Sequence, residues 1–166
     1  MTRTGTGPGP VSARSCLQVD VQRRVRGWAP RTGDIVSWAG SALGRHASGA
    51  ELAVRVVGPA ESRRLNARYR GKDKPTNVLS FPLQSPCALT LGRTPLGDLV
   101  ICAQVVRAEA REQRKPLRAH WAHLVIHGAL HLIGYDHESI RDARRMERRE
   151  IAVLRRLGFA NPYLSR

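Results

Sequence analysis

Residues 127–137, HGALHLIGYDH, place three histidines around a helix break. His127 and His131 are four residues apart, so on a helix their side chains lie on one face, one turn apart. Gly134 is a residue type that commonly ends helices, and the chain can fold back after it. His137 can then close the group as a third imidazole. The stretch therefore predicts a central helix that ends in a cluster of three histidines.

The chemistry of this cluster is that of a metal site. Three neutral imidazoles bind zinc and leave a fourth position open for water, which is the arrangement of a catalytic zinc site rather than a structural one. A water bound there becomes acidic enough to form hydroxide near neutral pH. A pair of histidines alone would favour satisfied core residues, whereas a third histidine after a helix breaker favours ligands. We therefore predict one Zn²⁺ per chain, held by His127, His131 and His137.

The same ligand spacing occurs in metzincin peptidases, whose pattern is H-E-x-x-H-x-x-G-x-x-H. In this chain the residue after the first histidine is Gly128 instead of glutamate. The general base of those peptidases is therefore missing. The spacing keeps a metallopeptidase as an alternative function, and Gly128 argues against it.

Outward from the histidines, hydrophobic periodicity predicts one domain of strands and helices without strict βαβ repetition. Apolar alternation and short apolar runs indicate four strands, within 17–21, 52–56, 78–81 and 99–102. Helical spacing indicates about five helices, near 34–46, 60–70, 103–114, 116–132 and 138–157. The run 99–102 is apolar at every position, as expected for a strand covered on both faces. Residues 1–15 have no periodicity and are predicted to be a disordered tail, residues 82–95 a connector, and residues 16–166 a single domain.

Charge is the strongest compositional signal. The 166 residues include 28 Lys+Arg against 13 Asp+Glu, which gives a formal net charge of +15. Nearly all of the basic residues are arginines, whose planar guanidinium suits bidentate contact with phosphate. This excess favours a polyanionic partner, although compositional bias would also produce it.

No stretch approaches the roughly 20 apolar residues that span a bilayer, and the three cysteines lack Cys-x-x-Cys spacing. We expect a cytoplasmic protein with no membrane partner and no nucleotide cofactor.

Three stretches of the chain together resemble the YbeY family of rRNA-maturation endoribonucleases. Residues 127–137 match its signature H-G-x-L-H-L-x-G-Y-D-H. Residues 69–82, YRGKDKPTNVLSFP, resemble its second hallmark, and residues 96–99, LGDL, resemble its Leu-Gly-Asp strand entry. The likeness covers about residues 51–162. It implies an α+β fold in which a four-stranded mixed sheet is surrounded by helices.

This resemblance implies a zinc-dependent endoribonuclease. The three histidines match the family's zinc ligands, and Arg70 matches the arginine on which its nuclease activity depends. The implied substrate is single-stranded RNA. The implied process is 3′-end maturation of 16S rRNA together with ribosome quality control, and the implied partners are ribosomal RNA and the small ribosomal subunit.

The chemistry of the residues around Arg70 is compatible with this activity. A guanidinium beside a zinc site would bind a phosphodiester and stabilise the charge that develops in the transition state. Lys72 and Lys74 share the same Gly/Pro loop and are candidates for RNA binding, or else belong to a solvated turn. Further residues are candidates for orienting the ligand imidazoles or for local structure only: Asp98, Asp136 and His123.

Two questions stay open from the sequence. The first part of the last predicted helix is rich in arginine, and these side chains either hold the RNA backbone or pair with the acidic residues of the same helix: Arg141, Arg144, Arg145, Arg148 and Arg149, against Glu138, Asp142, Glu147 and Glu150. The second question is the role of the zinc. A non-catalytic ribosome-assembly factor that uses zinc only for structure is a further alternative function.

Overall fold

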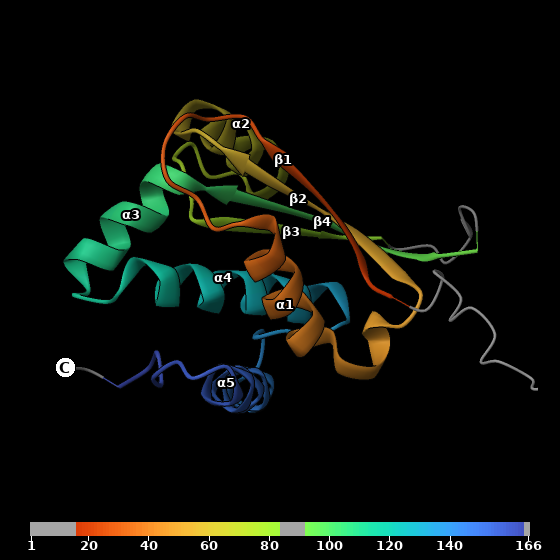
Figure 1. The fold of residues 1–166 in the computed structure, drawn as a ribbon. Coiled ribbons are helices and arrows are strands. Elements are labelled where there is room, and N and C mark those ends of the chain that lie inside the picture. Colours follow the sequence, from red (N-terminus) through yellow and green to blue (C-terminus); the bar gives the residue numbers. More distant parts are fainter. Residues whose placement is uncertain (1–15, 84–91, 165–166) are drawn as a thin grey trace, which may run out of the picture.

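A computed structural model describes residues 16–83 and 92–164. These residues form a four-stranded mixed sheet with five α-helices and one short 3₁₀ helix (Figure 1). In chain order the elements are β1 Gln18–Arg23, α1 Thr32–Leu43, η1 Gly44–Ala47, β2 Ala50–Val57, α2 Pro59–Arg70, β3 Val78–Pro82, β4 Thr94–Cys102, α3 Ala103–Glu112, α4 Leu117–Leu132 and α5 Ile140–Arg156. The predicted α+β class is confirmed. The predicted tail 1–15 and residues 84–91 of the predicted connector lie outside the described residues.

The strand order is β1-β2-β4-β3, so β4 lies inside the sheet between β2 and β3. β1, β2 and β4 are parallel, and β3 runs antiparallel to β4. Leu99 of β4 is opposite Val54 of β2 on one side and Ser80 of β3 on the other. This register fixes which side chains of the two inner strands meet the helices.

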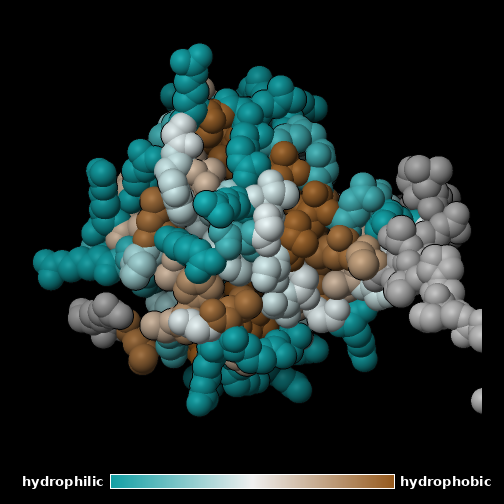
Figure 2. All heavy atoms as spheres, in the orientation of Figure 1, coloured by the Kyte–Doolittle hydropathy of each residue, from teal (hydrophilic) through white to brown (hydrophobic). Residues whose placement is uncertain are grey.

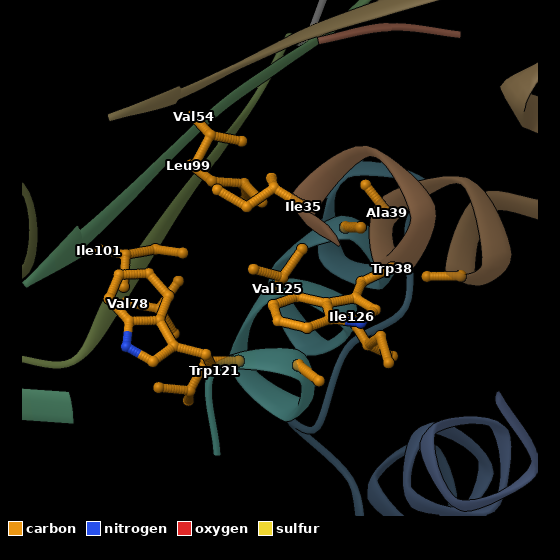
Figure 3. Close-up of a cluster of buried hydrophobic side chains, with 14 of the residues drawn as sticks. Ile35, Trp38, Ala39, Val54, Val78, Leu99, Ile101, Trp121, Val125 and Ile126 are labelled. Carbon is orange, nitrogen blue, oxygen red and sulfur yellow. The ribbon is translucent and has the colours of Figure 1, made fainter. Parts of the chain in front are cut away.

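One face of the sheet is covered by α1 and α4, which enclose the main core (Figure 3). Val54, Leu99 and Ile101 point from the strands toward Trp38 of α1 and Val125 of α4, and all five side chains are buried. The large apolar area removed from water here is the main stabilising contribution to the fold. α4 is therefore the central helix that the histidine stretch predicts.

The opposite face of the sheet carries a smaller apolar cluster. Val100 and Cys102 of β4 lie there with Val57 and Leu79, and Leu65 of α2 packs against them. Successive residues of β4 therefore alternate between two buried environments. This confirms the expectation that the apolar run 99–102 is covered on both faces.

β4 begins at Thr94, five residues before the strand expected from the sequence. The sequence pattern does not predict the first half of this strand, because it contains Pro95 and Gly97, and neither residue type is typical of a strand interior. The register shifts between Glu51 and Leu52 of β2, which marks a bulge at this point. Gly97 has a φ of 134°, and a Cβ there would lie 2.1 Å from the carbonyl oxygen of Phe81. Only glycine fits this close approach.

Helix ends also differ from expectation by a few residues. α1 ends at Leu43 and continues as the 3₁₀ helix η1, and α5 begins at Ile140 after Ser139, whose hydroxyl accepts the backbone N–H of Asp142. Such a side-chain acceptor is a common N-cap.

Among the described residues, no helix is both long and apolar enough to cross a membrane. Long hydrophilic side chains project around much of the face in Figure 2, as the high net charge requires.

Candidate metal centre

The second half of α4 and the turn after it bring three imidazoles together. His127 and His131 lie one turn apart on α4, and Gly134, with a φ of 92°, reverses the chain so that His137 returns to them. One ring nitrogen from each histidine lies within 4.8 Å of the others. The grouping expected from the spacing therefore forms, while its role as a ligand set stays a prediction.

A buried carboxylate orients the first of these histidines. Glu150 of α5 is fully buried, and its Oε1 accepts the Nδ1–H of His127 at 2.6 Å. Its Oε2 accepts the Nε2–H of His123 at 3.2 Å and the hydroxyl of Tyr163. Since Nδ1 of His127 carries the proton, Nε2 presents its lone pair to the histidine group. Carboxylates behind ligating imidazoles typically act in this way.

The hydrogen bonds also decide the charge of Glu150. Burial raises the pKa of the carboxyl, but the hydrogen bonds from His123, His127 and Tyr163 outweigh burial and lower it to about 2. The same contact and burial raise the pKa of the Tyr163 hydroxyl. At neutral pH the site therefore holds a carboxylate that accepts three hydrogen bonds, with the tyrosine as a neutral donor.

The three histidines fit a small divalent cation such as zinc. Nε2 of His127 and Nε2 of His131 are 3.2 Å apart. Two ligands bound at 2.0–2.1 Å in tetrahedral geometry lie about 3.3 Å apart. Burial and the nearby His127 and His137 lower the pKa of His131 to about 4. His131 is therefore neutral at pH 7, which is the form that binds metal.

Gly128 explains how close α4 approaches the sheet. A Cβ at this position would lie 2.8 Å from Cδ2 of Leu99 and 3.3 Å from Oγ of Ser80. The residue after the first histidine therefore faces β4 and β3 at close range, and it is buried. The carboxylate that metzincins carry at this position has no room here, which strengthens the argument against a peptidase.

Arg70 comes to the same pocket from a different helix. It is the last residue of α2, and it lines a pocket of about 450 Å³ together with all three histidines. Gly71 ends α2 in a left-handed conformation, with a φ of 67°. Asn77, Ser80, Glu147 and Tyr163 are among the other lining residues of this pocket, which we call the metal pocket.

The loop after α2 is tied back to that helix. The hydroxyl of Ser62 donates to the carbonyl oxygen of Thr76 at 2.9 Å, and the Asn66 side chain donates to the carbonyl oxygen of Lys74 at 2.8 Å. Arg63 and Asp73 form a bidentate ion pair on the surface. These contacts hold the end of α2, and with it Arg70, at a fixed place beside β3.

The remaining predicted site residues differ in how close they lie to the three histidines. His123 contacts Glu150 behind His127, and Asp136 accepts the backbone N–H of His137 at 2.7 Å. Lys72 and Lys74 are exposed and do not line the metal pocket. These two lysines can therefore contact RNA only on the surface, outside the metal pocket.

Asp98 is not brought to the histidines. It alternates with Leu99, and because Leu99 points to α4, Asp98 points to the opposite face of the sheet. There it lines a pocket with Arg55, Tyr69 and Phe81. The structure therefore corrects the expectation that Asp98 orients a ligand imidazole.

Sequence reasoning missed Glu150 and Tyr163. Glu150 was grouped with the solvated acids of the last helix, yet it is four residues after Met146 and three before Val153, and both of these are buried. An acid on the apolar stripe of a helix is the signal that could have found it. Tyr163 lies after the helix, and no local pattern marks it.

The fold and the site define an α+β protein in which a three-histidine group suited to a metal shares one pocket with an arginine. A family model described as Endoribonuclease YbeY matches residues 23–158. A protein of Alkalilimnicola ehrlichii named Endoribonuclease YbeY is 52% identical over 157 residues, covering 92% of this chain and 95% of the relative. The chain belongs to the YbeY endoribonuclease family.

A solved structure supports the fold alone. The solution structure of a Thermotoga maritima protein has a TM-score of 0.55 to this chain at 23% identity. The match covers 89% of this chain and 99% of that one. The arrangement of sheet and helices is therefore one that a distant sequence also adopts.

Proposed function

We propose that this protein, an endoribonuclease by its family, uses zinc held by His127, His131 and His137 to cleave single-stranded RNA in the 3′-end maturation of 16S rRNA and in ribosome quality control. It would act in the cytoplasm on the small ribosomal subunit. The observation that carries the proposal is that Arg70 shares a pocket of about 450 Å³ with the three histidines. A pocket that joins a metal-ligand set to a guanidinium is suited to a phosphodiester.

Each group has a separate task in this reaction. When bound, zinc supplies a Lewis acid for a phosphoryl oxygen and lowers the pKa of water. Arg70 binds the phosphate and offsets the negative charge that grows in the transition state. Glu150 keeps the proton of His127 on Nδ1, so that Nε2 stays available as a ligand. Asp136 fixes the backbone of His137.

Surface residues extend the contact with RNA. Lys72 and Lys74 are exposed on the loop that follows Arg70, so their ammonium groups meet phosphates outside the metal pocket. Point charges of this kind position a nucleic acid without reading its sequence. We include residues 16–166 in one catalytic domain.

The test is cleavage by the metal-loaded protein. We expect it to cut single-stranded rRNA fragments and to leave casein intact. Arg70→Ala should lower the cleavage rate by about 10²–10³-fold, as is typical when a transition-state charge loses its partner. Arg64→Ala, an exposed arginine of the same helix, is the matched control and should cleave normally. Intact RNA with the wild-type protein, or equal rates for both variants, would contradict the proposal.

Zinc content tests the ligand assignment separately. The doubly substituted His127→Ala/His131→Ala protein should lose the metal, as measured by elemental analysis, while the wild-type protein holds one zinc per chain. Full zinc content in this variant would exclude the assignment. Metal bound without RNA cleavage would favour the non-catalytic assembly factor, and casein cleavage would favour the peptidase.

A further inference from the structure

A second pocket with an unusual lining lies beside the start of α4. Its volume is about 290 Å³, and we call it the tryptophan pocket. Its lining residues are Trp28, Arg107, Ala110, Arg111, Lys115 and Leu117. Trp28 lies in the connection between β1 and α1 and is 47% exposed, whereas Trp38 and Trp121 are buried in the core. The indole of Trp28 is therefore open to a ligand.

All charges that line the tryptophan pocket are positive. Arg107 and Arg111 are one turn apart on α3, and Lys115 follows the helix. Among residues 16–83 and 92–164, no carboxylate forms an ion pair with either arginine. A Cβ built on Gly27 would lie 3.5 Å from Nη2 of Arg107, so this guanidinium lies against the loop that carries Trp28. An aromatic face and unpaired guanidinium groups meet at one place.

A larger cavity borders both this pocket and the metal pocket. The cavity has a volume of about 710 Å³, shares Lys115 with the tryptophan pocket, and shares Tyr163 with the metal pocket. Nζ of Lys115 donates to the carbonyl oxygen of Pro162 at 2.7 Å, which holds the segment after α5 beside the turn between α3 and α4 (Figure 1). Arg114 and Glu112 also line the cavity.

The tryptophan pocket lies at the start of α4, and the metal pocket lies at its second half. Leu117 lines the tryptophan pocket, and His127 is ten residues further along α4. At 1.5 Å per residue these two residues are about 15 Å apart along the helix axis. An RNA strand that occupies both pockets must therefore extend several nucleotides beyond the metal pocket.

We propose that the tryptophan pocket is a binding subsite for the RNA strand, several nucleotides from the bond that is cut. One base stacks on Trp28, and Arg107 and Arg111 bind the flanking phosphates. Stacking on an exposed aromatic side chain combined with a cationic groove is the usual way in which proteins hold single-stranded nucleic acid without sequence preference. The proposal rests on the proposed function, since it concerns the substrate of that same site.

Tryptophan fluorescence tests the contact directly, because Trp28 is the exposed one of the chain's three tryptophans. Titration of the metal-loaded Arg70→Ala protein, which cuts RNA slowly, with a single-stranded RNA of about twelve nucleotides should quench the emission of Trp28. A gel of the final sample shows whether the RNA has stayed intact. Adding Trp28→Phe to this protein should abolish the quenching. Absent quenching in the Arg70→Ala protein, or quenching that persists after Trp28→Phe, would overturn the proposal.

Substrate length separates the subsite from the metal pocket. Trp28→Ala should weaken binding of the longer RNA by about tenfold, the effect of losing one stacked base. The same variant should bind and cleave a trinucleotide like the wild-type protein. Equal weakening for both lengths, or no weakening, would overturn the subsite. If the wild-type protein cuts no RNA of either length, the proposed function fails instead.

Discussion

At the scale of single residues, the buried carboxylate of Glu150 is the most informative feature. A buried carboxylate is costly unless hydrogen bonds replace its water. Glu150 meets this requirement with three donors, and two of them are histidines of α4. The cost of burying the charge is thus offset by contacts that fix the orientation of His127. An acid kept at such a place is expected to serve the metal centre rather than the stability of the core.

We therefore expect Glu150→Gln to weaken zinc binding by about 10–100-fold, the usual effect of removing a carboxylate behind a ligating histidine. The amide has nearly the same size, so the fold should persist. It offers only one acceptor oxygen to three donors. Zinc affinity is measured by competition with a chelator, and circular dichroism monitors the fold.

Tyr163→Phe is the matched control for that substitution. It removes one hydrogen bond from Glu150 and leaves the carboxylate and both histidine contacts in place. Its zinc affinity should fall much less than that of Glu150→Gln. Similar losses in the two variants would show that the whole hydrogen-bond network around Glu150 matters, and not the charge behind His127 in particular.

A second prediction at this scale concerns Gly128. Gly128→Ala should destabilise the protein by about 1–3 kcal/mol, because the new methyl group lies 2.8 Å from Cδ2 of Leu99 and both elements would have to shift. Gly33→Ala is the control, since a Cβ at Gly33 meets nothing within 4 Å. In a helix that change should stabilise by up to about 1 kcal/mol. Urea unfolding of both variants measures the difference, and equal effects would contradict the close approach of α4 to β4.

At the scale of elements, one polar junction joins α3, α4 and β3. Glu109 of α3 accepts hydrogen bonds from His120 of α4 at 2.8 Å and from Asn77, which precedes β3, at 3.1 Å. Burial raises the pKa of Glu109, but the hydrogen bonds from His120 and Asn77 outweigh burial and lower it below its usual value. The charged form is therefore bound more tightly in the folded protein than the neutral form.

This shift sets the pH dependence of stability. Because the folded-state pKa of Glu109 is depressed, its contribution is complete above the unfolded pKa of about 4.5 and is lost as the pH falls through the folded value. Glu109→Gln should lower the free energy of unfolding by about 1 kcal/mol at pH 7, and the difference from wild type should shrink below pH 4.5. Glu112→Gln, an exposed acid of the same helix, should show a small effect throughout. A Glu109→Gln difference that stays constant with pH would contradict the junction.

The elements also show what local sequence can predict. Apolar periodicity located every strand and helix, because each of them presents a regular face to the core. It missed the first half of β4, because Pro95 and Gly97 belong to a bulge that only the partner strands explain. The suggestion that Asp98 orients a ligand imidazole came from its residue type alone, and it was wrong because the face of a strand residue depends on where the helices pack. The histidine group was predictable because a single helix and a single turn form it.

At the scale of the whole molecule, the net charge of +15 attracts RNA over a distance, whereas the residues of the metal pocket interact with RNA only by direct contact. Arg141, Arg144 and Arg148 of α5 are exposed, and within the part of the chain that the structure describes none of them pairs with a carboxylate. Of the three acids of α5, Glu150 is buried, Asp142 bonds to Ser139, and Glu147 lines the metal pocket. The helix therefore presents free positive charge beside the metal pocket.

This arrangement predicts a salt dependence that belongs to α5. Replacing Arg141, Arg144 and Arg148 by glutamine should reduce the slope of log K for RNA binding against log salt by about 2, because each lost phosphate contact on a single strand accounts for about 0.7. Filter binding at several salt concentrations measures the slope. Zinc affinity should not change, because these side chains do not line the metal pocket.

The control removes the same charge elsewhere on the surface. Arg24, Arg64 and Arg68 are exposed on α2 and in the connection after β1, at the opposite end of the molecule from α5 (Figure 1). If RNA lies along α5, replacing these three by glutamine should slow association slightly through the lower net charge and leave the slope nearly unchanged. If both triple variants lowered the slope equally, net charge alone would govern RNA binding, and the excess of arginine would reflect composition rather than a surface for RNA. The comparison therefore separates a local binding face from a global field in one measurement.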